Sequence, residues 1–400
     1  MARKVILHVG APKTGTSFVQ DVLFKNRESL AEQGILYAAD RFDAHFLAAL
    51  DLMQLPWGGL EQEAIGRWNR LAAEVRAHDG VAIISHEILG RASRLQVERA
   101  LTSLGGAEVH VVLSARDLVR QLPAEWQENV KHRRTTTYGD FLANLREPTR
   151  SAEIAQWFWG VQELPDVLDR WGSTLPKEHV HLVTVPPPGA PQELLWRRFA
   201  AVLGVDPALG ATPTEKANAS LGVTEAALIR RLNEVVNGRL PNHHYRQFVR
   251  EHLVHQNLGK HRTSAAIALP REAHEWASEL SRTWVAEVAL RGYDVVGDIA
   301  DLLPGEPRPW VDPDAVDSAE LADLAVDSLA TMTMEAARLR DVEIELHGVI
   351  DDLSAALDRA RSRRIHRAKE KLVAQADTNP AARVGLAAYR RLRGRNSRST

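Results

Sequence analysis

The chain has 400 residues, of which 44% are hydrophobic and 26% are charged. This composition excludes disorder throughout and, at roughly 150 residues per domain, allows two or three domains. The absence of cysteine excludes disulfide frameworks, cysteine-ligated zinc, iron–sulfur clusters and thiol nucleophiles. No segment approaches the ~18 apolar residues of a membrane span, and we expect a cytoplasmic protein.

The net charge of −2 hides an asymmetry between the last residues and the rest of the chain. Residues 359–400 contain 13 Lys or Arg and two acidic residues, which gives +11. The preceding 358 residues contain 37 basic and 50 acidic residues, which gives −13. We therefore expect different roles for the body and for this basic tail.

Short apolar runs alternate with helical patterns through the first half of the chain. This alternation is typical of a parallel sheet covered by helices. The expected strands are residues 4–9, 35–37, 81–85, 109–114 and 179–185. The sequence thus predicts an α/β fold with a P-loop-like central parallel sheet flanked by helices.

The second half of the chain is mainly helical in pattern. A proline-rich turn at 186–191 precedes the first of the helices expected at residues 192–203, 224–232, 245–255 and 270–290. Four prolines between residues 304 and 313 indicate a linker. Apolar residues at three- and four-residue spacing from 339 to 360 then predict a short coiled coil. We expect one domain at 1–303 and a helical extension at 304–400, made of linker, coiled coil and basic tail.

The strongest local pattern follows the first strand and precedes a helical run that begins at Phe18. It consists of Gly10, Ala11, Pro12, Lys13, Thr14, Gly15, Thr16 and Ser17. A strand–loop–helix turn presents free backbone N–H groups and the positive end of a helix dipole, which together bind phosphate. The glycines let the backbone curve around the anion, and the hydroxyls of the first helical turn add donors.

This loop departs from a Walker A sequence at one position. The residue after Gly15 is Thr16, where a Walker loop has lysine, and the lysine lies three residues earlier, at Lys13. A Walker lysine reaches the β- and γ-phosphates beside magnesium. A lysine within the loop is expected over the outer end of a 5′-phosphate, which argues against ordinary nucleoside triphosphate hydrolysis.

Residues 12–17 resemble, position by position, the first loop of the sulfotransferases that use 3′-phosphoadenylyl sulfate (PAPS). The resemblance implies that residues 10–17 grip the 5′-phosphosulfate of this donor. Residues 194–199 and 218–222 are similar to the bacterial branch of the family. Matching features extend over roughly residues 4–300, but only the first loop is highly specific.

The resemblance also implies an arginine for the 3′-phosphate of the donor, at the end of a later strand. Arg116 has this position, and a guanidinium can bind a phosphate through two parallel hydrogen bonds. A salt bridge to Asp117 or Glu87 is the structural alternative. The polar turn that contains Ser220 could return to the 3′-phosphate together with Lys216.

One family residue is missing. The serine that follows the arginine by eight residues is replaced by Ala124, which has no hydroxyl. Arg120, Gln121 or Gln127 on the expected helix could take its place, although Pro123 interrupts the helical pattern.

Sulfuryl transfer to a hydroxyl needs a base near the acceptor oxygen and a cation where charge builds on the leaving phosphate. We expect Lys13 to serve the leaving group. His86 and Glu87 end the strand at 81–85, where relatives carry a histidine or glutamate base. The ordinary pKa of about 6.5 favours His86 over Glu87, at about 4.3, as the base. The two residues could act together, and a helix start capped by Ser85 is the structural alternative.

Two other clusters carry less weight. Histidines at 243, 244, 252, 255 and 261 lack interleaved cysteines and carboxylates, so a solvated or core helix is expected rather than zinc. Trp157, Phe158 and Trp159 could line an acceptor pocket, although at least one is expected in the core.

The sequence therefore predicts a PAPS-dependent sulfotransferase that moves a sulfuryl group in line to a hydroxyl of a small molecule or carbohydrate, without a metal. Two alternatives stay open: a P-loop kinase, and a non-catalytic nucleotide-binding scaffold acting through its coiled coil and basic tail. Residues 311–400 are expected to support a homo-oligomer or contact with an anionic surface, and nucleic acid is not an expected partner. The acceptor is not identified.

Overall fold

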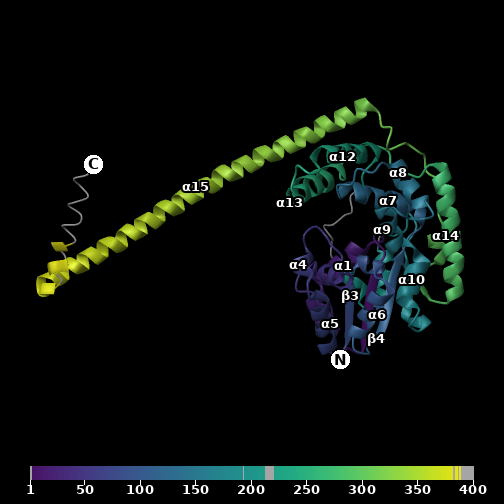
Figure 1. Ribbon diagram of the computed structural model, residues 1–400, viewed down its shortest axis with the longest axis horizontal. Coiled ribbons are helices and arrows are strands. Elements are labelled where there is room, and N and C mark those ends of the chain that lie inside the picture. The colour runs from purple at the N-terminus through teal and green to yellow at the C-terminus, as the bar shows by residue number, and fades with distance from the viewer. Residues whose placement is uncertain (1, 192, 212–219, 382, 386, 389–400) are drawn as a thin grey trace. The chain divides into compact units, whose positions relative to one another are not determined.

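The computed structural model describes residues 2–191, 193–211, 220–381, 383–385 and 387–388. The chain forms two compact units, Met1–Asp327 and Ser328–Thr400. The first unit contains a six-stranded parallel sheet flanked by helices (Figure 1), and the expected α/β fold is confirmed. No helix in the described part of the chain is both long and apolar enough to cross a membrane.

All strand pairs in the sheet are parallel, in the order β2-β3-β1-β4-β5-β6. The strands are β1 (Lys4–Gly10), β2 (Ile35–Leu36), β3 (Val81–Ser85), β4 (Glu108–Ala115), β5 (Val180–Thr184) and β6 (Asp294–Val296). Five of them lie where the apolar runs predicted strands. The sixth, β6, was not expected, because three residues beyond a long helix give too short a pattern.

The helices connect these strands. Between β1 and β4 they are α1 (Thr16–Lys25), α2 (Arg27–Glu32), α3 (Ala44–Met53), α4 (Glu61–Ala64), α5 (Arg67–Ala77), η1 (Glu87–Arg91) and α6 (Arg94–Ser103). Between β4 and β5 they are α7 (Leu118–Lys131), α8 (Tyr138–Arg146), α9 (Glu153–Gln162), α10 (Leu164–Gly172) and η2 (Lys177–His179). Beyond β5 they are α11 (Leu194–Leu203), η3 (Pro207–Ala211), α12 (Val223–Val236), α13 (Asn242–His244), the π-helix η4 (Tyr245–Leu258), α14 (Arg271–Arg291), η5 (Ile299–Leu302) and α15 (Ser318–Thr378).

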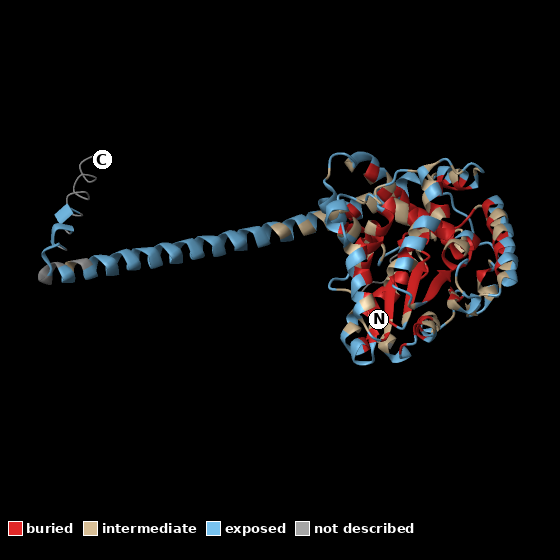
Figure 2. Cartoon of the chain, turned by 60° about the horizontal axis from the view of Figure 1, so that its bottom comes forward, coloured by how far each residue is buried: buried red, intermediate tan, exposed pale blue. Residues whose placement is uncertain are grey.

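The sheet is buried on both faces, as the near-continuous apolar runs of its strands require. Figure 2 shows the strands as a buried layer inside the first unit. On one face, residues of the strands meet α1 and α11. The core cluster there includes Ile6, Ile83, Val112 and Val183 from the strands and Val19, Leu23, Phe199 and Leu203 from the helices. This packing fixes the start of α1 against the end of β1, where the expected site lies.

The proline-containing segment after residue 303 belongs to the first unit and contacts the start of α8. The Asp314 carboxylate accepts hydrogen bonds from the backbone N–H groups of Tyr138 and Gly139, at 3.0 and 2.8 Å, and so caps the start of α8. Trp310 stacks on the Tyr138 ring, with centroids 6.0 Å apart.

Helix α15 has 61 residues and is about 90 Å long at 1.5 Å per residue. The expected heptad positions lie on this helix. Leu339 is half-buried, and Val342, Leu346, Val349 and Leu353 are exposed, from 38% for Val342 to 65% for Leu353. Figure 2 shows most of the helix in the colour of exposed residues. The apolar stripe is therefore available for contact with another chain.

Candidate functional site

The carboxyl ends of β1, β3 and β4 lie side by side, because β1 is hydrogen-bonded to both of the other strands. The chain crosses from one side of β1 to the other between β3 and β4, and ligands of open α/β sheets bind at such a point. The three segments predicted to carry the chemistry each follow one of these strands. The topology thus brings the loop at 10–17, the pair His86 and Glu87, and Arg116 to one edge of the sheet.

The loop after β1 is tied to the end of β4 by hydroxyl groups. The Thr14 hydroxyl donates to the Ala11 carbonyl oxygen at 2.6 Å and shares a hydrogen bond with the Ser114 hydroxyl. Ser114 in turn donates to the Gly10 carbonyl oxygen at 2.7 Å. Thr14 is therefore a buried anchor of the loop, and its hydroxyl is already used within the protein.

The backbone N–H groups of residues 13–17 have no hydrogen-bond acceptor among the described residues. The same is true of the Thr16 and Ser17 hydroxyls. Gly15 caps α1 with φ at 92°, and no side chain caps this helix. Five consecutive free donors at a helix N-terminus form the kind of concavity in which backbone groups bind an anion.

Two glycines of the loop leave no room for a side chain. A Cβ atom on Gly15 would lie 2.6 Å from Leu195 Cδ2, and φ at this residue is positive. A Cβ on Gly10 would lie 3.0 Å from the Glu87 carbonyl oxygen. These residues therefore have steric reasons to be glycine as well as the functional reason inferred from the sequence.

The Lys13 ammonium pairs with Glu128 on α7, with Nζ 2.6 Å from Oε2. Glu128 is surrounded by cations, because Lys131, His132 and Arg250 also lie within 4.0 Å of its carboxylate. Burial would raise the pKa of Glu128, but its hydrogen bond to His132 and the charge of Lys13 hold that pKa well below its usual range. The pattern of the loop did not reveal this carboxylate, which comes from a helix more than 100 residues away.

Two amides also hold the loop, and one of them, Gln121, is a residue expected to replace the missing serine. Gln121 of α7 and Gln162 of α9 both donate to the Pro12 carbonyl oxygen, at 2.7 and 3.1 Å. Gln162 also donates to the buried Glu125 carboxylate at 2.8 Å. Burial raises the pKa of Glu125. These contacts leave the N–H groups on the other side of the loop open.

Arg116 follows β4, as expected, and is half-buried. Its Nε donates to the Gln121 side chain at 2.9 Å, and a terminal nitrogen donates to the Arg120 carbonyl oxygen at 3.2 Å. Burial and the nearby charge of Arg120 lower the pKa of Arg116 to about 10, so the guanidinium stays charged at neutral pH. The alternative of a salt bridge to Asp117 or Glu87 does not occur in the structure, since neither carboxylate is an ion-pair partner of Arg116 there.

Arg120 is held in place by other groups. It pairs with the buried Asp117 and donates to the Pro186 carbonyl oxygen at 2.9 Å, which joins α7 to the end of β5. Helix α7 continues through Pro123, and Ala124 is half-buried on it. Gln127, an expected substitute for the missing serine, accepts a hydrogen bond from the Leu221 backbone at 2.9 Å.

The turn at residues 218–222 lies partly outside the described residues, which exclude Lys216. Ser220 is described and exposed, and its hydroxyl donates to the Gln127 side chain at 3.4 Å. This contact places the end of the turn beside α7, the helix that follows Arg116.

His86 and Glu87 follow β3 and are half-buried. Nδ1 of His86 accepts a hydrogen bond from the Ile88 backbone N–H at 3.3 Å, so His86, and not Ser85, caps η1. Burial lowers the pKa of His86, and the Glu87 charge opposes this effect. While Nδ1 accepts the cap bond, the neutral ring carries its proton on Nε2 and offers a donor.

Glu87 accepts a hydrogen bond from Gln20 on α1, with Nε2 2.7 Å from Oε2. Burial acts to raise the pKa of Glu87, but His86, the Gln20 hydrogen bond and Lys13 outweigh it, and this pKa lies below its ordinary value. The carboxylate is therefore ionised at neutral pH. Its interaction with Lys13 and Gln20 connects the end of β3 to the loop after β1.

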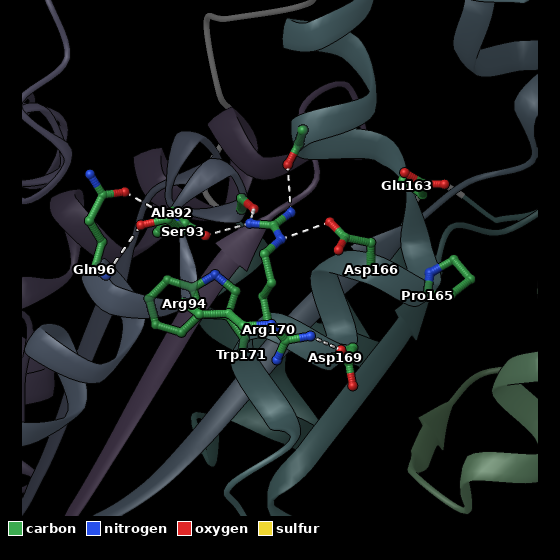
Figure 3. Close-up of polar contacts among 12 residues, drawn as sticks. Ala92, Ser93, Arg94, Gln96, Glu163, Pro165, Asp166, Asp169, Arg170 and Trp171 are labelled. Atoms are coloured by element: carbon green, nitrogen blue, oxygen red, sulfur yellow. Dashed lines mark hydrogen bonds and ion pairs between the residues drawn. The ribbon is translucent and has the colours of Figure 1, made fainter. Parts of the chain in front are cut away.

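The segment that carries Glu87 is fastened from α10 (Figure 3). Arg170 donates to the carbonyl oxygens of Gly90 and Ala92, at 2.7 and 2.5 Å, and pairs with Asp166 at 2.7 Å. Trp171 donates to the Leu89 carbonyl oxygen at 3.0 Å. Three anchored positions, Leu89, Gly90 and Ala92, hold the segment after β3 in one conformation, which favours a site built on rigid elements.

Half-buried aromatic residues extend away from His86. The Phe46 ring stacks on His86 with centroids 5.1 Å apart, Trp57 lies 5.7 Å from Phe46, and Trp157 lies 5.4 Å from Trp57. The Arg91 guanidinium lies over the Trp157 ring, 5.0 Å from its centroid. Of the three consecutive aromatics noted in the sequence, only Trp157 belongs to this cluster, because Phe158 and Trp159 are buried in the core.

Among solved structures, the chain is similar to a sulfotransferase from Alicyclobacillus acidocaldarius, with a TM-score of 0.42 and 17% sequence identity. The similarity covers 74% of this chain and 98% of that chain. No protein-family model matches the chain, and no curated protein matches it by sequence. At this level of similarity, the function has to be inferred from the side chains and the backbone of the site.

Proposed function

We propose that this chain is a sulfotransferase that moves a sulfuryl group from PAPS to a hydroxyl oxygen. The observation that supports the proposal most is the row of backbone N–H groups at residues 13–17, which have no acceptor within the described chain and belong to the loop that carries Lys13. A phosphosulfate offers oxygens on both phosphorus and sulfur. It can therefore accept from several donors of one helix N-terminus at once.

In the proposed reaction, the acceptor oxygen bonds to sulfur while the bond from sulfur to the 5′-phosphate oxygen breaks. The acceptor hydroxyl loses its proton to a base, and adenosine 3′,5′-bisphosphate leaves. Negative charge grows on the leaving phosphate, and Lys13 together with the loop N–H groups stabilises it. For this role Lys13 exchanges the Glu128 carboxylate for the donor.

Arg116 is proposed to bind the 3′-phosphate. It lies at the end of β4, beside the loop after β1, and it is charged without an ion-pair partner in the described structure. The Gln121 contact orients the guanidinium and also ties it to Pro12. Lys216 and Ser220 remain proposed contacts to the same phosphate from the turn after η3.

For the proton transfer we propose that His86 and Glu87 act as a pair, with Glu87 as the acceptor of the proton. The cap bond at Nδ1 leaves His86 with a donor at Nε2, which suits orientation of the acceptor hydroxyl better than removal of its proton. The Glu87 carboxylate is ionised and half-buried. This assignment reverses the preference that ordinary pKa values suggest.

The aromatic cluster of Phe46, Trp57 and Trp157 supports an acceptor that presents a flat apolar face. Both a carbohydrate ring and an aromatic small molecule have such a face, and rings of this kind stack on aromatic side chains. The cluster begins at His86 through the contact with Phe46. An acceptor that stacks there has its hydroxyl near the proposed base.

Calorimetric titration of the full chain with adenosine 3′,5′-bisphosphate, ATP and NAD tests the donor. We expect the bisphosphate to bind without magnesium and more tightly than the other two nucleotides. Magnesium-dependent ATP binding in its place favours a P-loop kinase. Bisphosphate binding without sulfation of any acceptor, in a screen of sugars and phenols with labelled PAPS, favours the non-catalytic scaffold.

Paired variants test the base. If Glu87 accepts the proton, Glu87→Gln lowers turnover by about 10²–10⁴-fold and His86→Gln lowers it less, because general-base catalysis contributes on this scale. Bisphosphate affinity is the control, and we expect it to change little in both variants. A much larger loss in His86→Gln than in Glu87→Gln returns the role of base to His86.

We propose that residues 311–400 support self-association or contact with an anionic surface. The exposed apolar residues Leu346, Val349 and Leu353 of α15 supply a stripe for a second helix, and the tail beyond residue 359 is basic. In the full chain, replacing these three residues by Asp should lower the mass measured by light scattering and leave bisphosphate binding intact. An unchanged mass contradicts self-association through this stripe.

A further inference from the structure

A second cluster of titratable side chains lies at the opposite end of the sheet, where β4, β5 and β6 begin. Nε2 of His110 lies 2.8 Å from Glu108 Oε1, and Nδ1 of His110 lies 2.8 Å from Nε2 of His181. Nδ1 of His181 lies 2.6 Å from Asp294 Oδ2. His179 stacks on the His110 ring, with centroids 4.1 Å apart. The start of β4 is about 20 Å from its end at about 3.3 Å per residue, so this cluster is separate from the proposed transfer site.

Three contacts connect Glu108, His110, His181 and Asp294 in a chain. They need one hydrogen or metal ion more than the two neutral imidazole rings supply. Each of the three contacts joins two atoms that bear lone pairs, so each needs a hydrogen or a metal ion between them. Two neutral imidazoles bring two N–H groups, and ionised carboxylates bring none. The third contact must therefore hold an additional proton or a metal ion.

We propose that Glu108, His110 and His179 bind a divalent first-row metal ion such as zinc. One ligand atom from each of these residues lies within 4.8 Å of the other two. Ligand atoms around tetrahedral zinc lie about 3.3 Å apart when the bonds are about 2.0–2.1 Å long. The Glu108 side chain is 54% exposed, so it can turn toward an incoming ion and leave a path for it. The His179 ring has to rotate out of its stack on His110, because the lone pairs of two nearly parallel rings do not point at one ion.

The neighbouring residues fit this assignment. If Nε2 of His110 binds the ion, Nδ1 carries the proton and donates to His181, which then donates to Asp294. Histidine ligands of metals usually donate their other N–H in this way, and the partner fixes the tautomer.

The charge around the cluster also permits a cation. Glu108 and Asp294 contribute two negative charges, and Lys4 of β1, which is in register with Glu108, contributes one positive charge. Two imidazoles and one carboxylate with an open position form a donor set that suits zinc and other first-row divalent metals better than magnesium or calcium. The proposal does not depend on the sulfotransferase assignment.

The test uses the full chain without an affinity tag, stripped with a chelator and titrated with zinc in a buffer without phosphate. We expect one high-affinity equivalent in the calorimeter. His110→Gln and His179→Gln should each weaken it at least 100-fold. His181→Gln and Asp294→Asn, which remove only the outer hydrogen bonds, should weaken it about 10–100-fold. His243→Gln with His244→Gln is the matched control, because these two rings also lie 4.0 Å apart, in α13, and this double variant should leave zinc binding unchanged.

Three results would overturn the proposal. The first is the absence of saturable zinc binding, which would leave an additional proton as the cation. The second is undiminished binding in His110→Gln, and the third is an equal loss in the control. Should the partly buried His110 variant fail to fold, Glu108→Gln at an exposed position serves in its place, with loss of the cobalt absorption bands of the substituted protein as the readout.

Discussion

Two helices follow the carboxyl ends of neighbouring strands and differ in the residue that caps their N-terminus. Helix α1 follows β1 and begins after Gly15, which offers no side chain to its free N–H groups. Helix α7 follows β4 and begins after Asp117, whose carboxylate accepts from the Arg120 N–H at 2.9 Å. The helix N-terminus that follows the strand is thus open at α1 and capped at α7.

The difference shows what converts a helix N-terminus into an anion site. Both helices have a positive N-terminal end and lie at the same edge of the sheet. At α7 the positive end is neutralised within the protein, and Arg120 takes the second oxygen of Asp117. At α1 no carboxylate caps the helix. Among the described residues, Glu128 pairs with the Lys13 side chain of the loop and leaves the backbone N–H groups free.

Among the changes at these two helices, the largest effect is expected in the loop before α1. Lys13→Ala should lower turnover by about 10²–10³-fold, the scale on which one preorganised charge stabiliser contributes. The fold should survive, because the side chain lies in a loop and is only half-buried. Glu128→Gln is the matched control, since it removes the ion pair and keeps the amine. It should retain turnover, and a loss as large as that of Lys13→Ala would show that the pair itself is what matters.

A smaller effect is expected at Arg116, just before the capped helix. Arg116→Ala should weaken adenosine 3′,5′-bisphosphate by about 10–100-fold, the range of a charge-assisted hydrogen bond of about 1.5–3 kcal/mol. Adenosine 5′-phosphate has no 3′-group and should lose little, as calorimetry with both nucleotides would reveal. Gln121→Ala keeps the guanidinium but removes the contact that orients it, so it should also weaken the bisphosphate selectively, and less than Arg116→Ala does. If Arg116→Ala weakens the binding of both nucleotides equally, Arg116 is a structural residue.

A carboxylate at the N-terminus of α1 should weaken bisphosphate binding about tenfold. Gly15→Asp places at α1 the carboxylate that α7 already has, and Gly15→Asn places a side chain of the same shape without charge. Both side chains would lie equally close to Leu195, so the difference in bisphosphate affinity between the two variants isolates the effect of the charge. We expect bisphosphate to bind about tenfold more weakly to the Asp variant than to the Asn variant, within the range of charges at helix ends. Equal affinities would mean that the α1 N-terminus does not contact the phosphate.

Opening the capped helix should have the smallest effect. Asp117→Ala removes the cap of α7 and should lower the free energy of unfolding by about 1 kcal/mol, measured by denaturant titration. Asp117→Asn keeps an oxygen for the Arg120 N–H and should lose less. An Ala variant as stable as the original protein would show that the cap contributes nothing to the start of α7.

The parts of this molecule that could be predicted from sequence are those that depend on neighbouring residues in the chain. The strands β1, β3, β4 and β5 are apolar runs, and the loop at 10–17 combines glycines, a lysine and hydroxyls within eight residues. Glu128 could not be predicted as the partner of Lys13, because their contact depends on how α7 packs beside the loop. Contacts of Pro12 with Gln121 and Gln162 escaped prediction for the same reason.

The two residues after β3 lie where the sequence placed them in the fold, and their roles stay predictions. The end of the strand predicted that His86 and Glu87 would lie at the site, but ordinary pKa values could not include the hydrogen bond from Ile88 to the His86 ring. That bond lies two residues away and depends on the turn of η1. Similarly, three consecutive aromatics suggested an acceptor surface, but helical geometry sends Phe158 and Trp159 into the core and leaves Trp157 beside Trp57.

The ion pair between Lys13 and Glu128 affects how strongly donor binding depends on ionic strength. A free lysine that binds a phosphate gains an ion pair, and added salt weakens that gain. Here the donor replaces Glu128, so one ion pair breaks as another forms and the net number is unchanged. Glu128 keeps His132 and Lys131 as neighbours after the exchange. Donor affinity should therefore vary with ionic strength less than the phosphate charge alone suggests, and the return of Lys13 to Glu128 gives the spent nucleotide a route of release.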